Sequence, residues 1–133
     1  MRKAFRTIGP AVAVALELAA CSSFVPEKET PVEENLYPKN YKTAILDRLR
    51  AQLPNEKGIR AAFLAEPVLR SRDSATRYIA CIRFDAKDDR GQYRGSKEYA
   101  AFFYGGDLTQ IVDAPREVCD KSAYQPFPEL ERL

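Results

Sequence analysis

Histidine is absent from this chain of 133 residues, and cysteine occurs only three times. Without histidine, a Ser-His-Asp or Cys-His catalytic arrangement is impossible, and the commonest general base of enzymes is missing. Zinc sites built from histidine and cysteine are excluded as well, because too few cysteines remain to complete one. We therefore expect a non-enzymatic protein with no catalytic residues, no metal and no dissociable cofactor.

A long apolar run is also missing. The run near the N-terminus, from Ile8 to Leu16, contains Gly9-Pro10 and is followed by Glu17. It is about half as long as a transmembrane helix of roughly 20 residues, so it is too short to span a membrane. Basic residues precede this run and small residues follow it, which is the order found in a secretory signal peptide.

The signal-like segment closes with Leu18-Ala19-Ala20-Cys21. These residues resemble the lipobox of bacterial lipoproteins, which implies that Cys21 becomes the mature N-terminus and carries diacylglycerol, the one covalent lipid we expect. Two acyl chains are enough for stable membrane attachment. Ser22, in place of aspartate, implies sorting in a Gram-negative cell to the periplasmic face of the outer membrane. The alternative is an ordinary cysteine in a disordered tail.

The chain divides into three parts on this interpretation. Residues 1–20 form the signal peptide, residues 21–36 form the acylated cysteine with a flexible tether, and residues 37–133 form one small α+β domain. The tether sequence FVPEKETPVEEN is rich in proline and glutamate and has little to bury, which is typical of a disordered linker. Removing the leader leaves 18 basic and 18 acidic residues of the original 21 and 19.

The remaining charges are unevenly placed. Residues 57–97 contain ten basic and five acidic side chains, whereas residues 98–133 contain three and seven. The candidate anion-binding residues, with Arg60 beside them in the basic part, are Arg70, Arg72, Arg77, Arg83, Arg90 and Arg94. They could contact anionic lipid, lipopolysaccharide phosphate or peptidoglycan. The alternative is a solvated sheet face whose arginines pair with the acidic C-terminal part.

Apolar residues at helical spacing predict an amphipathic helix from about Pro38 to Leu53, which Pro54 would end. Three runs rich in β-forming residues, 59–70, 76–87 and 97–114, predict four antiparallel strands, because Gly105-Gly106 divides the last run into a hairpin. We expect an α+β domain: the helix packs on a four-stranded antiparallel sheet, and the C-terminal segment crosses the other face in extended form.

The strand patterns also predict positions within this sheet. Pro67 in the first run predicts an edge strand. The residues of the second run expected to face the helix are Tyr78, Ala80, Ile82 and Phe84. The hairpin register expected from a two-residue loop pairs Phe103 with Leu108, Ala101 with Gln110 and Tyr99 with Val112. Phe102 and Ile111 then fall on the face away from the helix.

With Cys21 acylated, Cys81 and Cys119 are the only pair left for a disulfide in an oxidising compartment. Two buried free thiols are the alternative. Because Cys81 is expected opposite the helix, the bridge would draw the C-terminal segment across that face. The expected cover consists of Tyr124, Phe127 and Leu130 over Ile79, Phe102 and Ile111. The ending AYQPFPELERL could instead be displayed for a partner.

Two weak motifs point to other chemistry. Residues 85–96 resemble a calcium loop, but lysine, arginine and serine stand at the third, sixth and twelfth positions, so a polar hairpin is favoured. A carboxylate pair for acid–base catalysis could be drawn from Glu66, Asp73 and Asp85, although nothing in their spacing favours it. Both motifs are better explained by turns and a solvated surface.

Three segments of the mature part, YPKNYKTAIL, RYIACIRF and YQPFPEL, resemble small lipoproteins of alphaproteobacteria. This resemblance implies the domain limits and no activity or site residues. Our first hypothesis is an anchored, non-catalytic binding or assembly module for another envelope protein. The second is a binder of anionic envelope polymer or lipid through the arginines, and the third is a weak carboxylate enzyme. The expected contacts are the membrane and an envelope protein, without nucleic acid.

Overall fold

The computed structural model describes residue 9, residues 35–53 and residues 58–133. Cys21, all of the expected signal peptide except residue 9, and nearly all of the expected tether lie outside these described residues. The chain divides into residues 1–30 and residues 31–133, and the fold given below is that of the second unit. No helix in the described parts of the chain is long and apolar enough to cross a membrane.

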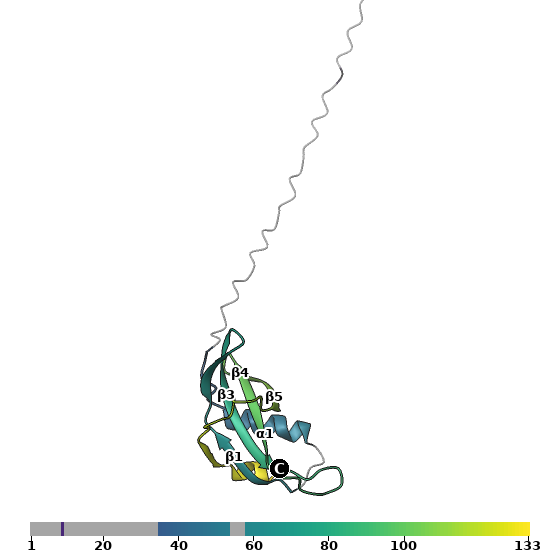
Figure 1. The fold of residues 1–133 in the computed structure, drawn as a ribbon. Coiled ribbons are helices and arrows are strands. Elements are labelled where there is room, and N and C mark those ends of the chain that lie inside the picture. The colour runs from purple at the N-terminus through teal and green to yellow at the C-terminus, as the bar shows by residue number, and fades with distance from the viewer. Residues whose placement is uncertain (1–8, 10–34, 54–57) are drawn as a thin grey trace, which may run out of the picture. The chain divides into compact units, whose positions relative to one another are not determined.

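In its described part, the chain forms a six-stranded antiparallel sheet with one helix of twelve residues and a second of four (Figure 1). The elements are α1 (Tyr41–Gln52), β1 (Arg60–Ala65), β2 (Val68–Arg72), β3 (Ala75–Asp85), β4 (Lys97–Tyr104), β5 (Asp107–Asp113), β6 (Tyr124–Pro126) and α2 (Pro128–Glu131). The strand order is β5-β4-β3-β1-β6, and β2 also pairs with β3. Every pairing between these strands is antiparallel.

The expected α+β domain with a four-stranded sheet is therefore wrong, because the molecule is mostly β. The first predicted run breaks at Glu66-Pro67 into β1 and β2, since proline has no N–H group for the ladder. Of these two strands, β2 lies at an edge as predicted, whereas β1 lies between β3 and β6. The sixth strand comes from the C-terminal segment, which was expected to cover the sheet and instead joins it at residues 124–126.

Helix α1 begins three residues later than the sequence predicts. The N–H of Tyr41 donates to the carbonyl of Pro38 at 3.1 Å in a turn that precedes the helix. Ile45 and Leu49 lie one helical turn apart and are the buried residues of α1. They pack in the core on one side of the sheet, here called the helix-side core.

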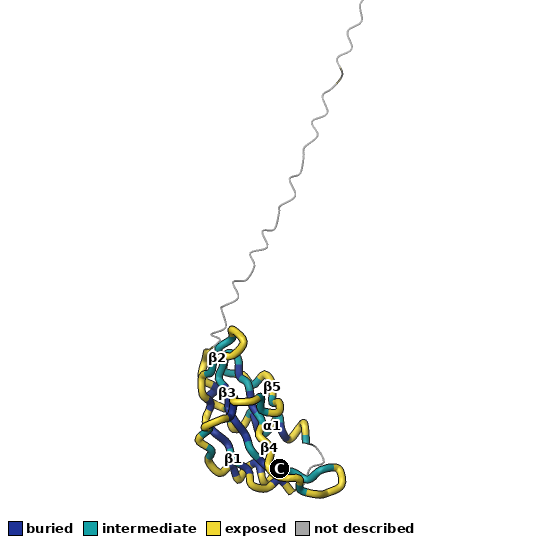
Figure 2. The backbone as a smooth tube through the Cα atoms, viewed as in Figure 1, coloured by how far each residue is buried: buried dark blue, intermediate teal, exposed yellow. Residues whose placement is uncertain are grey.

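Strand β3 supplies both faces of the sheet with buried residues, and Figure 2 shows the buried positions along its length. Ala80, Ile82 and Phe84 belong to the helix-side core, as the alternation predicts. Ile79 and Cys81 belong to a second cluster on the opposite face, which we call the disulfide-side core. The predicted assignment of faces along β3 is confirmed.

The hairpin between β4 and β5 is correct in its loop and wrong in most of its register. Tyr104 pairs with Asp107 around Gly105-Gly106, and Phe103 pairs with Leu108 as expected. A bulge follows at Thr109, whose hydroxyl donates to the carbonyl of Phe102 at 2.9 Å.

The bulge shifts the remaining pairs by one residue. Ala101 pairs with Ile111 instead of Gln110, and Tyr99 pairs with Asp113 instead of Val112. A shift of one residue exchanges the two faces of a strand. Ile111 therefore packs on the helix-side core, the reverse of the expectation.

The C-terminal segment also departs from its predicted place. Tyr124 packs on the disulfide-side core as expected, but Phe127 and Leu130 are buried in the helix-side core. The N–H of Phe127 donates to the carbonyl of Ala62 at 2.8 Å, which carries the chain past the end of β6 and into α2. The extended cover over Ile79 and Phe102 is therefore not formed by these two side chains.

Candidate binding groove

A disulfide joins Cys81 on β3 to Cys119, with the two Cα atoms 5.7 Å apart. This distance lies in the usual range for a bridge. Val118 and Cys119 are buried against the sheet and complete the disulfide-side core. The bridge holds the segment after β5 over part of this face, and the face remains hollowed beside that segment.

A hollow on this face has a volume of about 740 Å³. Its charged or polar lining residues include Arg70, Arg72, Arg77 and Gln110, and its apolar ones include Ile79, Phe102 and Val112. Two further hollows, of about 450 and 440 Å³, share Arg70 and Ile79 with it, and the smaller is also lined by Arg116. We call the connected hollow around these residues the arginine groove.

The pairing of β2 with β3 explains why three predicted arginines meet here. Arg70 lies opposite Arg77, and Arg72 lies opposite Ala75. Residues directly opposite each other in an antiparallel pair have their side chains on the same face. Val68 lies opposite Ile79, so the whole alternating set of β2 shares the face of the disulfide.

The charge in this groove is only partly compensated. Arg72 forms an exposed ion pair with Asp73 at 3.3 Å, and Arg77 lies over the ring of Tyr104 at 4.8 Å. The Nε of Arg70 is buried and, within the described residues, has no hydrogen-bond partner. Like charges opposite each other destabilise a sheet, and a buried donor without a partner adds a further cost.

The structure places the other predicted arginines outside the groove. Arg83 lies between the rings of Phe63 and Tyr124, at 4.9 and 4.5 Å. Arg94 pairs with Asp88 at 2.7 Å, and Arg90 is an exposed residue of the same turn. The six arginines therefore do not form one surface. Arg116, which the sequence did not single out, lines the groove from the acidic C-terminal part.

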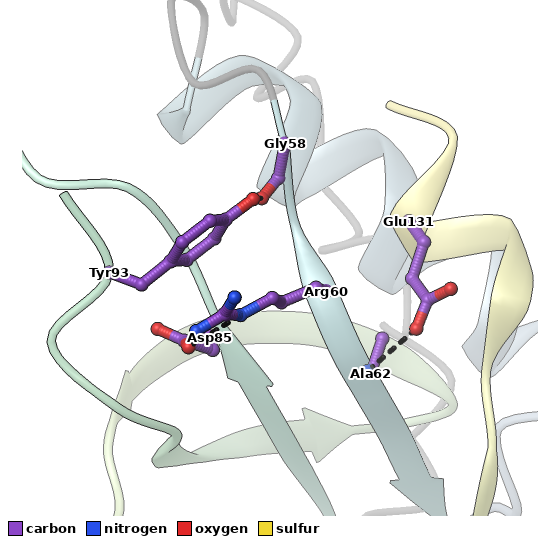
Figure 3. Close-up of polar contacts among 6 residues, drawn as sticks. All are labelled: Gly58, Arg60, Ala62, Asp85, Tyr93 and Glu131. Carbon is purple, nitrogen blue, oxygen red and sulfur yellow. Dashed lines mark hydrogen bonds and ion pairs between the residues drawn. The ribbon is translucent and has the colours of Figure 1, made fainter. Parts of the chain in front are cut away.

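Arg60 has a structural role at the start of β1 (Figure 3). Its Nε contacts a carboxylate oxygen of Asp85 at 3.0 Å, and Asp85 is only 4% exposed. The guanidinium also lies 3.6 Å from the centre of the Tyr93 ring. The Tyr93 hydroxyl donates to the carbonyl of Gly58, where a Cβ atom would lie only 2.8 Å from that hydroxyl. These contacts fasten the loop after β3 to the start of β1.

A bulge in β1 lies beside this cluster. Ala61 has a φ of 51°, and the register of β1 against β3 shifts between residues 60 and 63. The N–H of Ala62 donates to Glu131 Oε1 at 3.0 Å (Figure 3), so the short helix α2 supplies an acceptor where the ladder is interrupted. The contact connects the C-terminus to β1 and suggests no chemistry beyond that.

The loop that superficially resembles a calcium loop is organised by one aspartate. Asp88 accepts hydrogen bonds from the N–H groups of Arg90 and Gln92, both at 2.9 Å, and from Arg94 Nε at 2.7 Å. The Arg94 bond, followed by that from Gln92, holds the pKa of Asp88 below its usual value. In the described part of the chain, no three histidine, cysteine, aspartate or glutamate residues are placed to hold a metal ion.

Two of the carboxylates considered for acid–base roles are used in ion pairs, Asp73 with Arg72 and Asp85 with Arg60. On the disulfide side, Tyr124 donates to Glu98 Oε2 at 2.5 Å. Burial, together with this hydrogen bond, raises the pKa of Tyr124 above its usual value. Asp85 and Glu98 thus take part in contacts between strands, whereas Asp73 pairs with its neighbour in the sequence.

No protein-family model, curated protein or solved structure matches this chain. The chemistry of the arginine groove is therefore the basis for the function proposed below.

Proposed function

We propose that this protein is a non-catalytic lipoprotein of the bacterial envelope, anchored through lipid on Cys21 to the periplasmic face of the outer membrane. The lipobox-like residues 18–21 support the anchor. The Cys81–Cys119 disulfide supports an oxidising compartment, where such bonds form and persist. The domain would then stand off the membrane on residues 21–36.

We further propose that the arginine groove binds an anionic group, which favours the second of the two binding hypotheses. The observation that carries this proposal is the placement of Arg70 directly opposite Arg77, with Arg116 lining the adjoining hollow. An anion would relieve the repulsion between the two guanidinium groups. Guanidinium groups suit this task because they bind carboxylate and phosphate with two parallel hydrogen bonds.

The ligand class is an anionic envelope polymer or lipid, such as phosphorylated lipopolysaccharide or peptidoglycan. Ile79, Phe102 and Val112 form an apolar floor beside the charges. A ligand with both charged and apolar parts would use the whole groove, and a small inorganic anion would use only part of it.

Titration of the purified mature lipoprotein in detergent with lipopolysaccharide and with soluble peptidoglycan fragments tests this function. We expect Arg77→Ser to weaken binding at least tenfold, and Arg50→Ser to leave it unchanged, because Arg50 is an exposed residue of α1 paired with Asp47. Binding should also weaken between 20 and 150 mM salt, as charged contacts are screened. If the Arg77→Ser variant and the unmodified protein bind both ligands with equal affinity, the arginine groove is not the binding site.

A second candidate function, a module for another envelope protein, is favoured by the edge strand β2. Val68 and Leu69 on this strand are 49% and 43% exposed. In-cell crosslinking from residue 69, followed by mass spectrometry, should capture one protein reproducibly. A crosslinker placed on Thr43 of α1 provides the control surface.

A further inference from the structure

Among the described residues, β1 has a neighbouring strand on its outer side, whereas β2 has none. Strands β1 and β2 pair one after the other along the same side of β3, through Leu64 with Ile82 and Val68 with Ile79. Strand β6 lies outside β1 and pairs with residues 63–65. Within the described residues, nothing pairs with β2 on the side away from β3. The position that would continue β6 is therefore open.

A hollow of about 450 Å³ lies next to this open position, on the disulfide side of the sheet. Ile79 and Cys81 of β3 line it together with Val68 and Arg70 of β2. The rest of its lining comes from the end of β1 and from the segment leading into β6, and includes the charged residues Glu66 and Lys121. Alternate N–H and C=O groups of an edge strand point away from its partner strand. An added strand can therefore pair with the outer edge of β2, beside this hollow, and continue the ladder.

The three described edge strands, β5, β6 and β2, differ in their protection. On β5, the Thr109 bulge interrupts the strand, and Arg48 of α1 donates to the Thr109 carbonyl at 3.3 Å. Bulges and covering elements are common means of blocking edge pairing. Strand β2 pairs with β3 over five consecutive residues without a register shift. The remaining edge strand, β6, has only three residues, so β2 is the described edge that offers the longest regular stretch for pairing.

Charge decides which kind of strand fits. Two copies paired through β2 would bring the arginines of both edges together, and like charges in cross-strand positions are destabilising. A strand with carboxylates at alternate positions would instead face Arg70 and Arg72 on the disulfide side, near Lys121. Its other face would contact Leu69, which is exposed on the opposite side of β2.

We propose that β2 binds an extended acidic segment of another protein, which adds to the sheet as a strand in line with β6. Carboxylates at every second position of this segment pair with Arg70 and Arg72, and the intervening apolar residues contact Leu69. The proposal rests on the second function above and specifies the partner chemistry. Main-chain hydrogen bonds supply affinity in strand addition, and alternate side chains supply specificity.

The test uses the isotope-labelled mature lipoprotein in detergent and three synthetic heptapeptides. The first alternates glutamate with valine, the second replaces the central valine by proline, and the third replaces every glutamate by lysine. We expect the first peptide to slow amide hydrogen exchange at alternate residues of β2 at least tenfold. The proline and lysine peptides should give no such protection, because one breaks the ladder and the other reverses the charge.

Two variants complete the design. Exchanging both Arg70 and Arg72 for glutamate should abolish the protection by the first peptide, whereas Arg50→Glu should preserve it. Equal binding by the proline peptide would show attraction by charge alone; it would overturn strand addition and leave the anion-binding function standing. Absence of β2 protection with the first peptide would also overturn the proposal, whatever the lipopolysaccharide titration shows.

Discussion

The arginines of this protein differ by what lies next to each guanidinium. Arg60, Arg77 and Arg83 each lie over an aromatic ring, a contact that attracts the cation without neutralising it. Arg60 is also paired with Asp85, so it has no free charge to offer a ligand. Arg77 has no carboxylate partner among its described contacts and faces a second arginine. Counting charges in the sequence could not separate these cases, because the ring partners come from other strands and from the loop after β3.

Asp88 provides a test of the loop geometry at the residue scale. Its folded pKa is below the ordinary value of 3.8 because Arg94 and Gln92 donate hydrogen bonds to the carboxylate. A lowered folded pKa stabilises the loop above the unfolded pKa, and this contribution is lost as pH falls through the folded value. NMR titration should give Asp88 a pKa below 3.8.

Arg94→Ala removes the largest cause, so it should raise the pKa of Asp88 toward 3.8. Arg90→Ala is the matched control, since Arg90 bonds Asp88 through its backbone N–H. Identical titration curves for the Arg94→Ala variant and the unmodified protein would contradict the assigned bond.

Leu49 provides the second test at this scale. It is 2% exposed and lies in the helix-side core with Ile45. Leu49→Ala should lower the free energy of unfolding by about 2 to 5 kcal/mol, depending on how far the cavity closes. Urea denaturation measures this change, with Arg50→Ala as an exposed control on the same helix. A loss below about 0.5 kcal/mol, the size of an ordinary surface effect, would show that α1 is not docked.

At the scale of elements, the periodicity of the sequence correctly predicted the features that depend on one short segment of the chain. The helical stripe of α1, the alternation along β3 and the Gly105-Gly106 loop are each contained in a short segment. The bulge at Thr109 could not be found this way, because Ile111 and Val112 are adjacent β-branched residues and either could face the core. The sequence offered one neglected signal for α2: Pro128 starts a turn in which Phe127 and Leu130 are three residues apart.

The candidate groove was half predictable for a similar reason. The sequence singled out Arg70, Arg72 and Arg77, but not the turn that sets them on one face. Asp73 and Ser74 form that turn with φ angles of 48° and 65°. Such angles suit a tight hairpin, yet Asp-Ser is a weaker signal for it than Asn-Gly or Asp-Gly. The β2–β3 hairpin and the register of its arginines therefore appear only in the fold.

Thr109 provides a test of the β5 bulge. Its hydroxyl donates to the Phe102 carbonyl, so Thr109→Val keeps the shape of the side chain and removes the hydrogen bond. We expect the free energy of unfolding to fall by about 1 kcal/mol. Thr43→Val on the exposed face of α1 is the control. If the Thr109→Val variant is as stable as the control and the amide shifts in β4 are unchanged, the Thr109 hydroxyl does not help to set the register of β4 against β5.

At the scale of the whole domain, the two faces of one sheet are covered by different means. The helix-side core is closed by apolar area from α1, Phe127 and Leu130. The disulfide-side core has few large residues, and a covalent bond holds Val118 and Cys119 against it. A small domain has limited apolar surface to bury, and a disulfide covers one face of the sheet without requiring many large apolar side chains. It leaves the rest of that face open as the arginine groove.

The disulfide is therefore expected to contribute both to the stability of the domain and to binding in the groove. Cys81 and Cys119 are 38 residues apart, and closing such a loop is worth roughly 4 kcal/mol in the chain-entropy model. We expect reduction to lower the free energy of unfolding by about this amount, which is measured as a lower midpoint of urea denaturation. Reduction should also weaken lipopolysaccharide binding, because the segment bearing Arg116 is no longer held over the sheet. Alkylation of denatured, unreduced mature protein should modify neither thiol.

The control for this last prediction is a double variant with alanine at both cysteines, which should have the reduced protein's midpoint and show no response to reductant. Its binding separates two roles of the bridge. If the double variant binds lipopolysaccharide as tightly as the oxidised protein does, the strands of the sheet suffice to form the groove, with Arg70 and Arg77 as its charged residues. If its binding falls together with that of the reduced protein, the segment tied down by Cys119 completes the groove. Our structure predicts the second result, because Arg116 and Val118 line the hollow next to Arg70.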